Sequence, residues 1–262
     1  MPLPETPRVI YAKNPLEAVI CQLRFPPILR IAAELPAAFQ ERIREEYPLL
    51  RERPAFAVPA GIPPQMMMKA IPSELSVALG GRTFDFLSAD EKWQLSLNQQ
   101  HLVLTTTSYE RWEGFRIRLD GAHRSLLEIY RPSFYSRMGL RYRDVIRRSV
   151  LGLSDIPWYE LLSPAIAGEL ASPLADEVEH AAREFVLRLP DSAARVRVRH
   201  GLIGAADSEA RYVIDADFYN EPKTETADAF TVLDTFNKHA GRLFRWCISD
   251  RLHDAMEPWP AC

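Results

Sequence analysis

Cysteine is scarce in this chain of 262 residues, which contains only Cys21, Cys247 and Cys262. An odd, sparse set of cysteines without a Cys-x-x-Cys spacing argues against a disulfide framework and against a zinc site. We therefore expect a protein of the reducing cytoplasm that holds no metal. No sequence motif indicates a cofactor either.

The chain also lacks a surplus of positive charge, long apolar runs and a signal peptide. Its formal net charge is -3 and its pI is about 6.1, so a basic nucleic-acid-binding protein is not indicated by the whole chain, although a local basic face is compatible with these values. No apolar run approaches the roughly 20 residues that span a bilayer. The first residues show no basic region followed by an apolar one. We expect no membrane association.

Catalytic motifs are missing as well. Gly80-Gly81 lacks the Lys-Ser/Thr or third glycine of a phosphate-binding loop, and neither Gly-x-Ser-x-Gly nor His-Glu-x-x-His occurs. Asp250 and His253 lie three residues apart on a predicted helix, where a solvated helical face is the simplest interpretation. These absences favour a binding function over an enzyme.

Three segments with a period of two predict a β-meander. The strands are expected over 83–88, 92–98 and 101–108, with apolar side chains on one face and polar side chains on the other. Such clean alternation indicates a sheet that is covered on one side only. The helix expected over 110–128 is the natural cover.

The stretch from Tyr109 to Asp144 changes from a helical period to a strand period. Trp112, Phe115, Leu119 and Ala122 recur at three- and four-residue steps, which places them on one helical face. From Phe134 the period is two, so the strand has an apolar face and an arginine face. The apolar face holds Phe134, Met138, Leu140 and Tyr142, and the other holds Arg137, Arg141 and Arg143.

The second half repeats this plan in outline. Helical segments broken by prolines are expected over 145–151 and 158–170, followed by strands at 181–189, 195–203 and 210–219 and one long helix from Asp228 to Met256. We predict an α+β fold with antiparallel sheets, each covered by a long helix. The lobes are 1–150 and 176–262, joined by a helical bridge at 151–175, and their likeness raises the hypothesis of a structural repeat.

The chain resembles a sporadically distributed family of uncharacterised prokaryotic proteins. The resemblance rests on these segments: Tyr11, Pro15 and Glu17 to Phe25; Tyr109, Trp112 and Phe115; Arg137 to Tyr142; Asp215 to Tyr219; and Met256 to Pro258. Its most specific piece is Gly139-Leu-Arg-Tyr142, and the chain departs from the family pattern just afterwards, at Arg143-Asp144. The resemblance implies a shape, without an activity, and a setting among mobile or defence genes.

Two rows of arginines are candidate sites. In the second lobe, Arg195 and Arg197 alternate with valines, and the partner strand carries Asp215 and Asp217. Pairing Arg197 with Asp215 and Arg195 with Asp217 would neutralise this row and fix the hairpin register. We therefore interpret these four residues as structural ion pairs.

The first-lobe row is the candidate binding surface. Arg137, Arg141 and Arg143 share a face on which we find no acidic strand of matching parity. Guanidinium groups among hydroxyls and amides suit phosphates or acidic peptides. The margin of this surface holds His101, Thr105 and Thr107. The alternative is that Arg137 or Arg141 is buried and pairs with Glu17, Glu110, Glu113 or Glu128.

The leading hypothesis is a non-enzymatic binding or regulatory module that captures an acidic or phosphate-bearing partner, either a protein or a nucleic acid. One alternative is a nuclease or RNA-processing enzyme with His101 or His253 as proton carrier. Another is a subunit of a larger assembly, in which Met66–Met68 and the proline-rich N-terminal arm become ordered against a partner.

Overall fold

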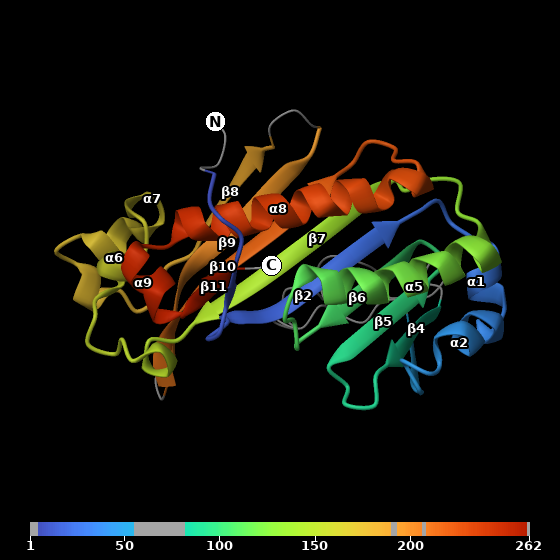
Figure 1. Ribbon diagram of the computed structural model, residues 1–262, viewed down its shortest axis with the longest axis horizontal. Coiled ribbons are helices and arrows are strands. Elements are labelled where there is room, and N and C mark those ends of the chain that lie inside the picture. Colours follow the sequence, from blue (N-terminus) through green and yellow to red (C-terminus); the bar gives the residue numbers. More distant parts are fainter. Residues whose placement is uncertain (1–4, 55–81, 190–192, 206–207, 261–262) are drawn as a thin grey trace, which may run out of the picture.

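The structure is a computed structural model, and it describes residues 5–54, 82–189, 193–205 and 208–260. The strands in these ranges form one nine-stranded antiparallel sheet and one separate two-stranded sheet. Helices α5 and α8 lie across one face of the large sheet (Figure 1). The α+β class expected from the sequence is confirmed, whereas Met66–Met68 lie outside the described residues.

The two predicted lobes share a single sheet, because β7 pairs with β2 on one side and with β10 on the other. The expectation of separate sheets is therefore wrong, although each half does have its own long helix. In spatial order the strands are β3 (Leu49–Pro54), β4 (Arg82–Leu87), β5 (Trp93–Asn98), β6 (His101–Thr106), β2 (Leu16–Arg24), β7 (Arg137–Ile146), β10 (Ser208–Asn220), β9 (Arg195–Ala205) and β8 (Arg183–Arg188).

The meander β4–β5–β6 lies where the alternation predicts it. Its apolar side chains, among them Phe86, Leu95 and Leu104, are fully buried beneath α5 (Trp112–Tyr130), whose own buried stripe includes Phe115 and Leu119. Two short helices, α1 (Leu29–Ala33) and α2 (Ala37–Ile43), flank α5, and α2 packs against it. The apolar face of the strands therefore packs against the apolar face of α5, and together they form the core of this half.

The connection between the halves differs from the predicted helix. Strand β7 continues to Ile146, because its backbone still pairs with β10 there. Short helical turns follow: η1 (Ser149–Leu151), α6 (Trp158–Leu161), α7 (Pro164–Ala167), η2 (Gly168–Ala171) and η3 (Ala175–Glu177). A buried contact holds them on the sheet, since His200 Nδ1 lies 2.7 Å from the Tyr212 hydroxyl, which donates to the Ile166 carbonyl.

The last helix is broken in two, which corrects the single helix expected from Asp228 to Met256. After the turn η4 (Thr226–Asp228), α8 (Ala229–Cys247) ends at Ile248, whose extended backbone bridges Leu162. A second helix, α9 (Asp250–Ala255), then begins, with the Ser249 hydroxyl accepting from the Leu252 amide. A serine N-cap of this kind satisfies a free amide at a helix start.

The order of elements supports the hypothesis of a structural repeat. In each half a strand, short helices, a three-stranded meander and a long helix follow one another, from β2 to α5 and from β7 to α8. The sheet order β4-β5-β6-β2 is mirrored by β8-β9-β10-β7, with β2 and β7 paired antiparallel at the centre. The strand β3 and the small sheet of β1 (Val9–Tyr11) and β11 (Pro258–Pro260) lie outside this pattern. No helix in the described part of the chain is long and apolar enough to cross a membrane.

Candidate functional site

The predicted binding residues do gather on the face of the sheet that α5 and α8 leave uncovered. Through the registers of β6, β2 and β7, His101 lies in line with Arg137, and Thr105 lies in line with Arg141. Thr107 follows the end of β6 and is exposed. The alternation from Gly139 onward is therefore as expected, and the guanidinium groups do lie on the outer face.

The expectation that these arginines are uncompensated is wrong. Arg137 Nη2 lies 2.9 Å from Asp217 Oδ2, and Arg141 donates from Nε and Nη2 to the two oxygens of Asp215 at 2.6 and 2.5 Å. The physical reason is that β10 lies beside β7, so its acidic side chains share the same face. Arg143 contacts Glu17 of β2, a glutamate that the alternative had assigned to Arg137 or Arg141.

The second-lobe arginines have other partners than those predicted. The hairpin register places Asp217 opposite Arg197 and Asp215 opposite Arg199, two residues away from the predicted pairing. Arg197 and Arg199 contact Glu184 of β8, at 3.5 and 2.5 Å, and Arg195 Nη1 lies 3.4 Å from Glu221. Asp215 and Asp217 are structural ion-pair residues, but they neutralise β7 instead of β9.

The two histidines considered as proton carriers do not share a site. His101 lies on β6 on the sheet face opposite α5 and α8, whereas His253 lies on α9, where its Nδ1 is 2.8 Å from the Tyr11 hydroxyl. Desolvation, opposed by the carboxylates of Asp250 and Asp254, lowers the pKa of His253. In the described ranges no cluster of three or more His, Cys, Asp or Glu side chains could hold a metal ion.

A pocket of about 450 Å³ lies on the helix-covered side, where the start of α5, the second half of α8 and the N-terminal segment meet above β7 and β10. This volume falls within the range of about 300–1,000 Å³ that is usual for small-molecule sites. Its walls carry aromatic rings and a few polar groups. The lining includes Tyr11, Tyr109, Trp112, Tyr142, Asp144 and Asn237.

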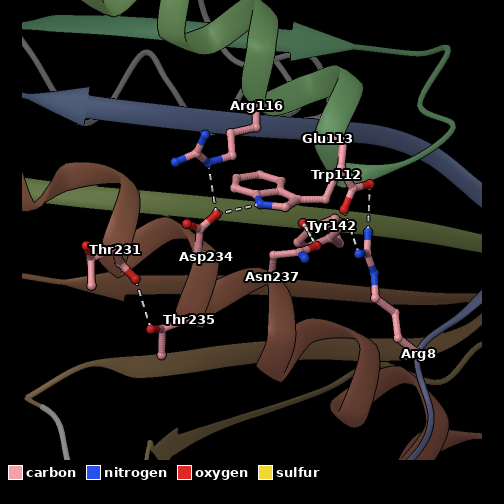
Figure 2. A network of polar contacts seen from close by, with 9 residues as sticks. All are labelled: Arg8, Trp112, Glu113, Arg116, Tyr142, Thr231, Asp234, Thr235 and Asn237. Atoms are coloured by element: carbon pink, nitrogen blue, oxygen red, sulfur yellow. Dashed lines mark hydrogen bonds and ion pairs between the residues drawn. The ribbon is translucent and has the colours of Figure 1, made fainter. Parts of the chain in front are cut away.

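Polar contacts fix the wall between α5 and α8 (Figure 2). The Trp112 indole Nε1 donates to Asp234 Oδ1 at 2.7 Å, and Arg116 Nε reaches the same oxygen at 3.2 Å. Beside them the Tyr142 hydroxyl donates to Asn237 Oδ1 at 2.9 Å. These contacts tie side chains of both long helices and of β7 together, so this wall is preorganised.

Asp144 is a buried carboxyl group that this pocket exposes to a ligand. It lies two residues beyond Tyr142 on the inner face of β7, it lines the pocket, and it is 6% exposed. No hydrogen bond or ion pair to its carboxyl group occurs among the residues that the structure describes. Burial, and secondarily the negative charge of Asp215, raise the pKa of Asp144 to about 8.

The sequence does contain a signal that places Asp144 on the inner face of the strand. Continuing the alternation of Met138, Leu140 and Tyr142 by one more step places an acid on the apolar face. The helix expected over 145–151 hides this step, because it begins directly after Asp144. An acid on the apolar face of a strand is costly to bury, and such groups concentrate at functional sites.

The N-terminal segment 5–14 forms a strap that closes the pocket. Its Arg8 guanidinium makes a two-pronged contact with Glu113 of α5, at 2.6 and 2.9 Å. At the other end, Tyr11 bonds to His253, and β1 pairs with β11. Burial raises the pKa of Tyr11 to about 12, so its hydroxyl stays protonated at neutral pH. The strap is thereby fastened to α5 and to α9.

Neither a scan against protein-family models nor a search of the curated proteins finds a match to this chain. The fold and the pocket therefore define its class: an α+β protein with a strapped pocket that has an acid among its lining residues.

Proposed function

We propose that this protein is a non-enzymatic binding module whose ligand is a small molecule held in the pocket between α5 and α8. The observation that carries the proposal is the Asp144 carboxyl group, which has no partner among the described residues, on a preformed, aromatic-walled pocket. Concave sites with a few convergent polar groups and a perturbed pKa are the usual form of ligand sites. The scarcity of cysteine supports a cytoplasmic setting.

Capture of an acidic or phosphate-bearing partner by the sheet face opposite α5 and α8 stays a prediction. The aspartates of β10 and Glu17 of β2 offset the arginines of β7, so that surface has less support than the pocket. The nuclease alternative has less again, because it needs His101 or His253 beside a free arginine cluster, and the arginines of β7 in line with His101 and Thr105 are engaged in ion pairs. The setting among defence or mobile genes rests on the family resemblance alone.

Gly241 allows the pocket to be blocked without disturbing the core. It lies on α8 in the pocket wall, and a Cβ at this position meets nothing within 4 Å. Gly121 of α5 is an equally open helical glycine that does not line the pocket, so Gly121→Trp is the matched control. Both substitutions also replace a poor helix former, which offsets any loss of folding stability.

The test is a thermal-shift screen of small polar and aromatic compounds, followed by calorimetry on the compounds that raise the melting temperature. Ligands should bind the native protein and Gly121→Trp alike, and should bind Gly241→Trp at least about tenfold more weakly, a loss of about 1.4 kcal/mol. Compounds that bind Gly241→Trp as well as the control, or the lack of any ligand, would contradict the pocket as the site.

A further inference from the structure

The charges around the pocket are unevenly distributed, with an acid buried in the sheet and cations on the helices and the strap. The titratable groups that interact electrostatically with Asp144 are Tyr11 on the strap, Cys247 on α8 and Asp215 on β10. Within the described ranges, none of these neighbours is a cation. A ligand group that meets this carboxyl therefore supplies the positive charge that the protein does not.

The mouth of the pocket is mostly positive, because five cations and one further acid, the exposed Glu110, belong to the pocket lining. Arg8, Arg242 and Arg245 line it but are engaged, with Glu113, Glu5 and Asp250 respectively. Arg111 and Lys238 also line it, both are exposed, and no ion pair to either occurs in the described part of the chain. Two cations are thus available to a ligand at the mouth, within one pocket length of a buried acid.

We infer that the ligand is a small zwitterion, namely an amino acid or a short peptide, with its ammonium group on Asp144 and its carboxylate toward Arg111 and Lys238. This inference rests on the proposed function and narrows it to one chemical class. The rings of Tyr109, Tyr142 and Phe244 line the space between the two ends, where they can cover an apolar body and face an ammonium group.

Other ligand classes fit these charges less well. A metal ion would need several carboxylate or imidazole ligands close together, and in the described ranges no group of three or more His, Cys, Asp or Glu side chains could hold one. A plain anion would use the cations alone and would oppose the ionisation of Asp144 at the inner end. A plain amine would leave the cations of the mouth without a partner. Only a molecule with both charges is complementary at both ends.

The direct test is calorimetry with a panel of amino acids and dipeptides, each compared with its N-acetylated and its C-terminally amidated form. Acetylation removes the ammonium charge and should weaken binding at least about tenfold, which is the effect expected when one charge-assisted hydrogen bond is lost. Amidation should weaken binding to native protein but not to the double variant Arg111→Met/Lys238→Met, in which the cations of the mouth are already absent.

The pH dependence is a second readout of the same geometry. Burial keeps Asp144 mostly protonated at pH 7, so an ammonium ligand must displace that proton to form the ion pair. Affinity should rise about tenfold per pH unit from pH 6 toward pH 8 and level off there, because the ligand's own amine then begins to lose its proton. Calorimetry in buffers of different ionisation enthalpy should show about one proton released per ligand bound.

Asp144→Asn removes the ionisable carboxyl group and keeps the shape of the side chain. It should abolish both the preference for the free ammonium form and the rise of affinity with pH, while a denaturation curve confirms that the variant folds. Acetylated peptides that bind as tightly as free ones, or affinity that falls as pH rises, would overturn the inference. If no member of the panel binds while other screened compounds are excluded by Gly241→Trp, the inference fails and the proposed function stands. If no compound binds, both fail.

Discussion

Asp144 is held in the fold at a thermodynamic cost, and that cost depends on pH. Its pKa is about 8 in the native protein and about 3.9 in an unfolded chain, so the native state binds the proton more tightly. The carboxyl group therefore contributes no penalty below about pH 4, and its penalty grows as pH rises to about 8. Buried ionisable groups with a strongly shifted pKa are concentrated at functional sites, where they interact with a ligand.

Asp144→Asn should therefore be more stable than the native protein in alkali. We expect the difference in unfolding free energy between the two proteins to grow by about 3–5 kcal/mol between pH 4 and pH 8, in favour of the variant. Urea denaturation at several pH values measures it. A difference that does not change with pH would show that the carboxyl group is already ionised and solvated in the native state.

At the scale of elements, the strap and the broken last helix show what the sequence could not predict. The alternation in β4, β5 and β6 predicts their position to within two residues, because each strand has one apolar face. The break at Ile248 is not predicted by the sequence, because it coincides with a bridge to Leu162, which is 86 residues away. Amphipathic spacing continues through Leu252 and shows no sign of that distant contact.

The error in the β9–β10 register has a related cause. A shift of two residues leaves every side chain on its own face, so alternation and charge pairing cannot distinguish Arg197 from Arg199 as the neighbour of Asp215. The sequence also does not predict that β7 and β10 are neighbours in the sheet, because they are more than 60 residues apart along the chain. Only the placement of β10 between the two arginine rows shows which row the aspartates neutralise.

The strap should act on ligand exchange more than on stability. Arg8 and Glu113 are each nearly half exposed, so Arg8→Met should lower the unfolding free energy by less than about 1 kcal/mol. It should nevertheless speed hydrogen exchange at Val9–Tyr11 and increase the ligand off-rate, because one end of the strap is freed. Exchange followed by mass spectrometry and stopped-flow release are the measurements.

Arg42→Met is the control for this prediction. Its partner Glu128 lies near the other end of α5, the two side chains are 51% and 53% exposed, and neither lines the pocket. It should leave both the exchange at Val9–Tyr11 and the off-rate unchanged. Equal effects of the two variants on the off-rate would show that general loosening of α5, and not the strap, controls exchange.

At the scale of the whole molecule, the β7–β10 pairing makes the two halves one cooperative unit. Nine residue pairs join these strands, and Arg141 with Asp215 reinforces the seam by a two-pronged ion pair. The helix-side core is likewise continuous across both halves. A boundary at which one half could unfold alone is therefore not expected.

Asp215→Asn should weaken the seam and leave the molecule cooperative. We expect a loss of about 1–3 kcal/mol, reduced by the partial exposure of Arg141, whose side chain is 37% accessible. Replacing one set of tryptophans lets the fluorescence of the other set follow the unfolding of one half. Trp93 and Trp112 report on the first half, and Trp158 and Trp246 report on the second. Coincident urea transitions for both sets are expected, and two separate transitions would show independent lobes.

The mirrored strand order bears on how such a molecule could arise. A polypeptide of half this length, ending after α5, would leave the long edge of β2 unpaired, and an open edge of that kind invites pairing with another chain. Two such polypeptides could pair antiparallel along that edge about a two-fold axis, as β2 and β7 do here, and gene fusion would then make the union permanent. The strapped pocket, built from the start of one long helix and the latter half of the other, would be a novelty of the fused form.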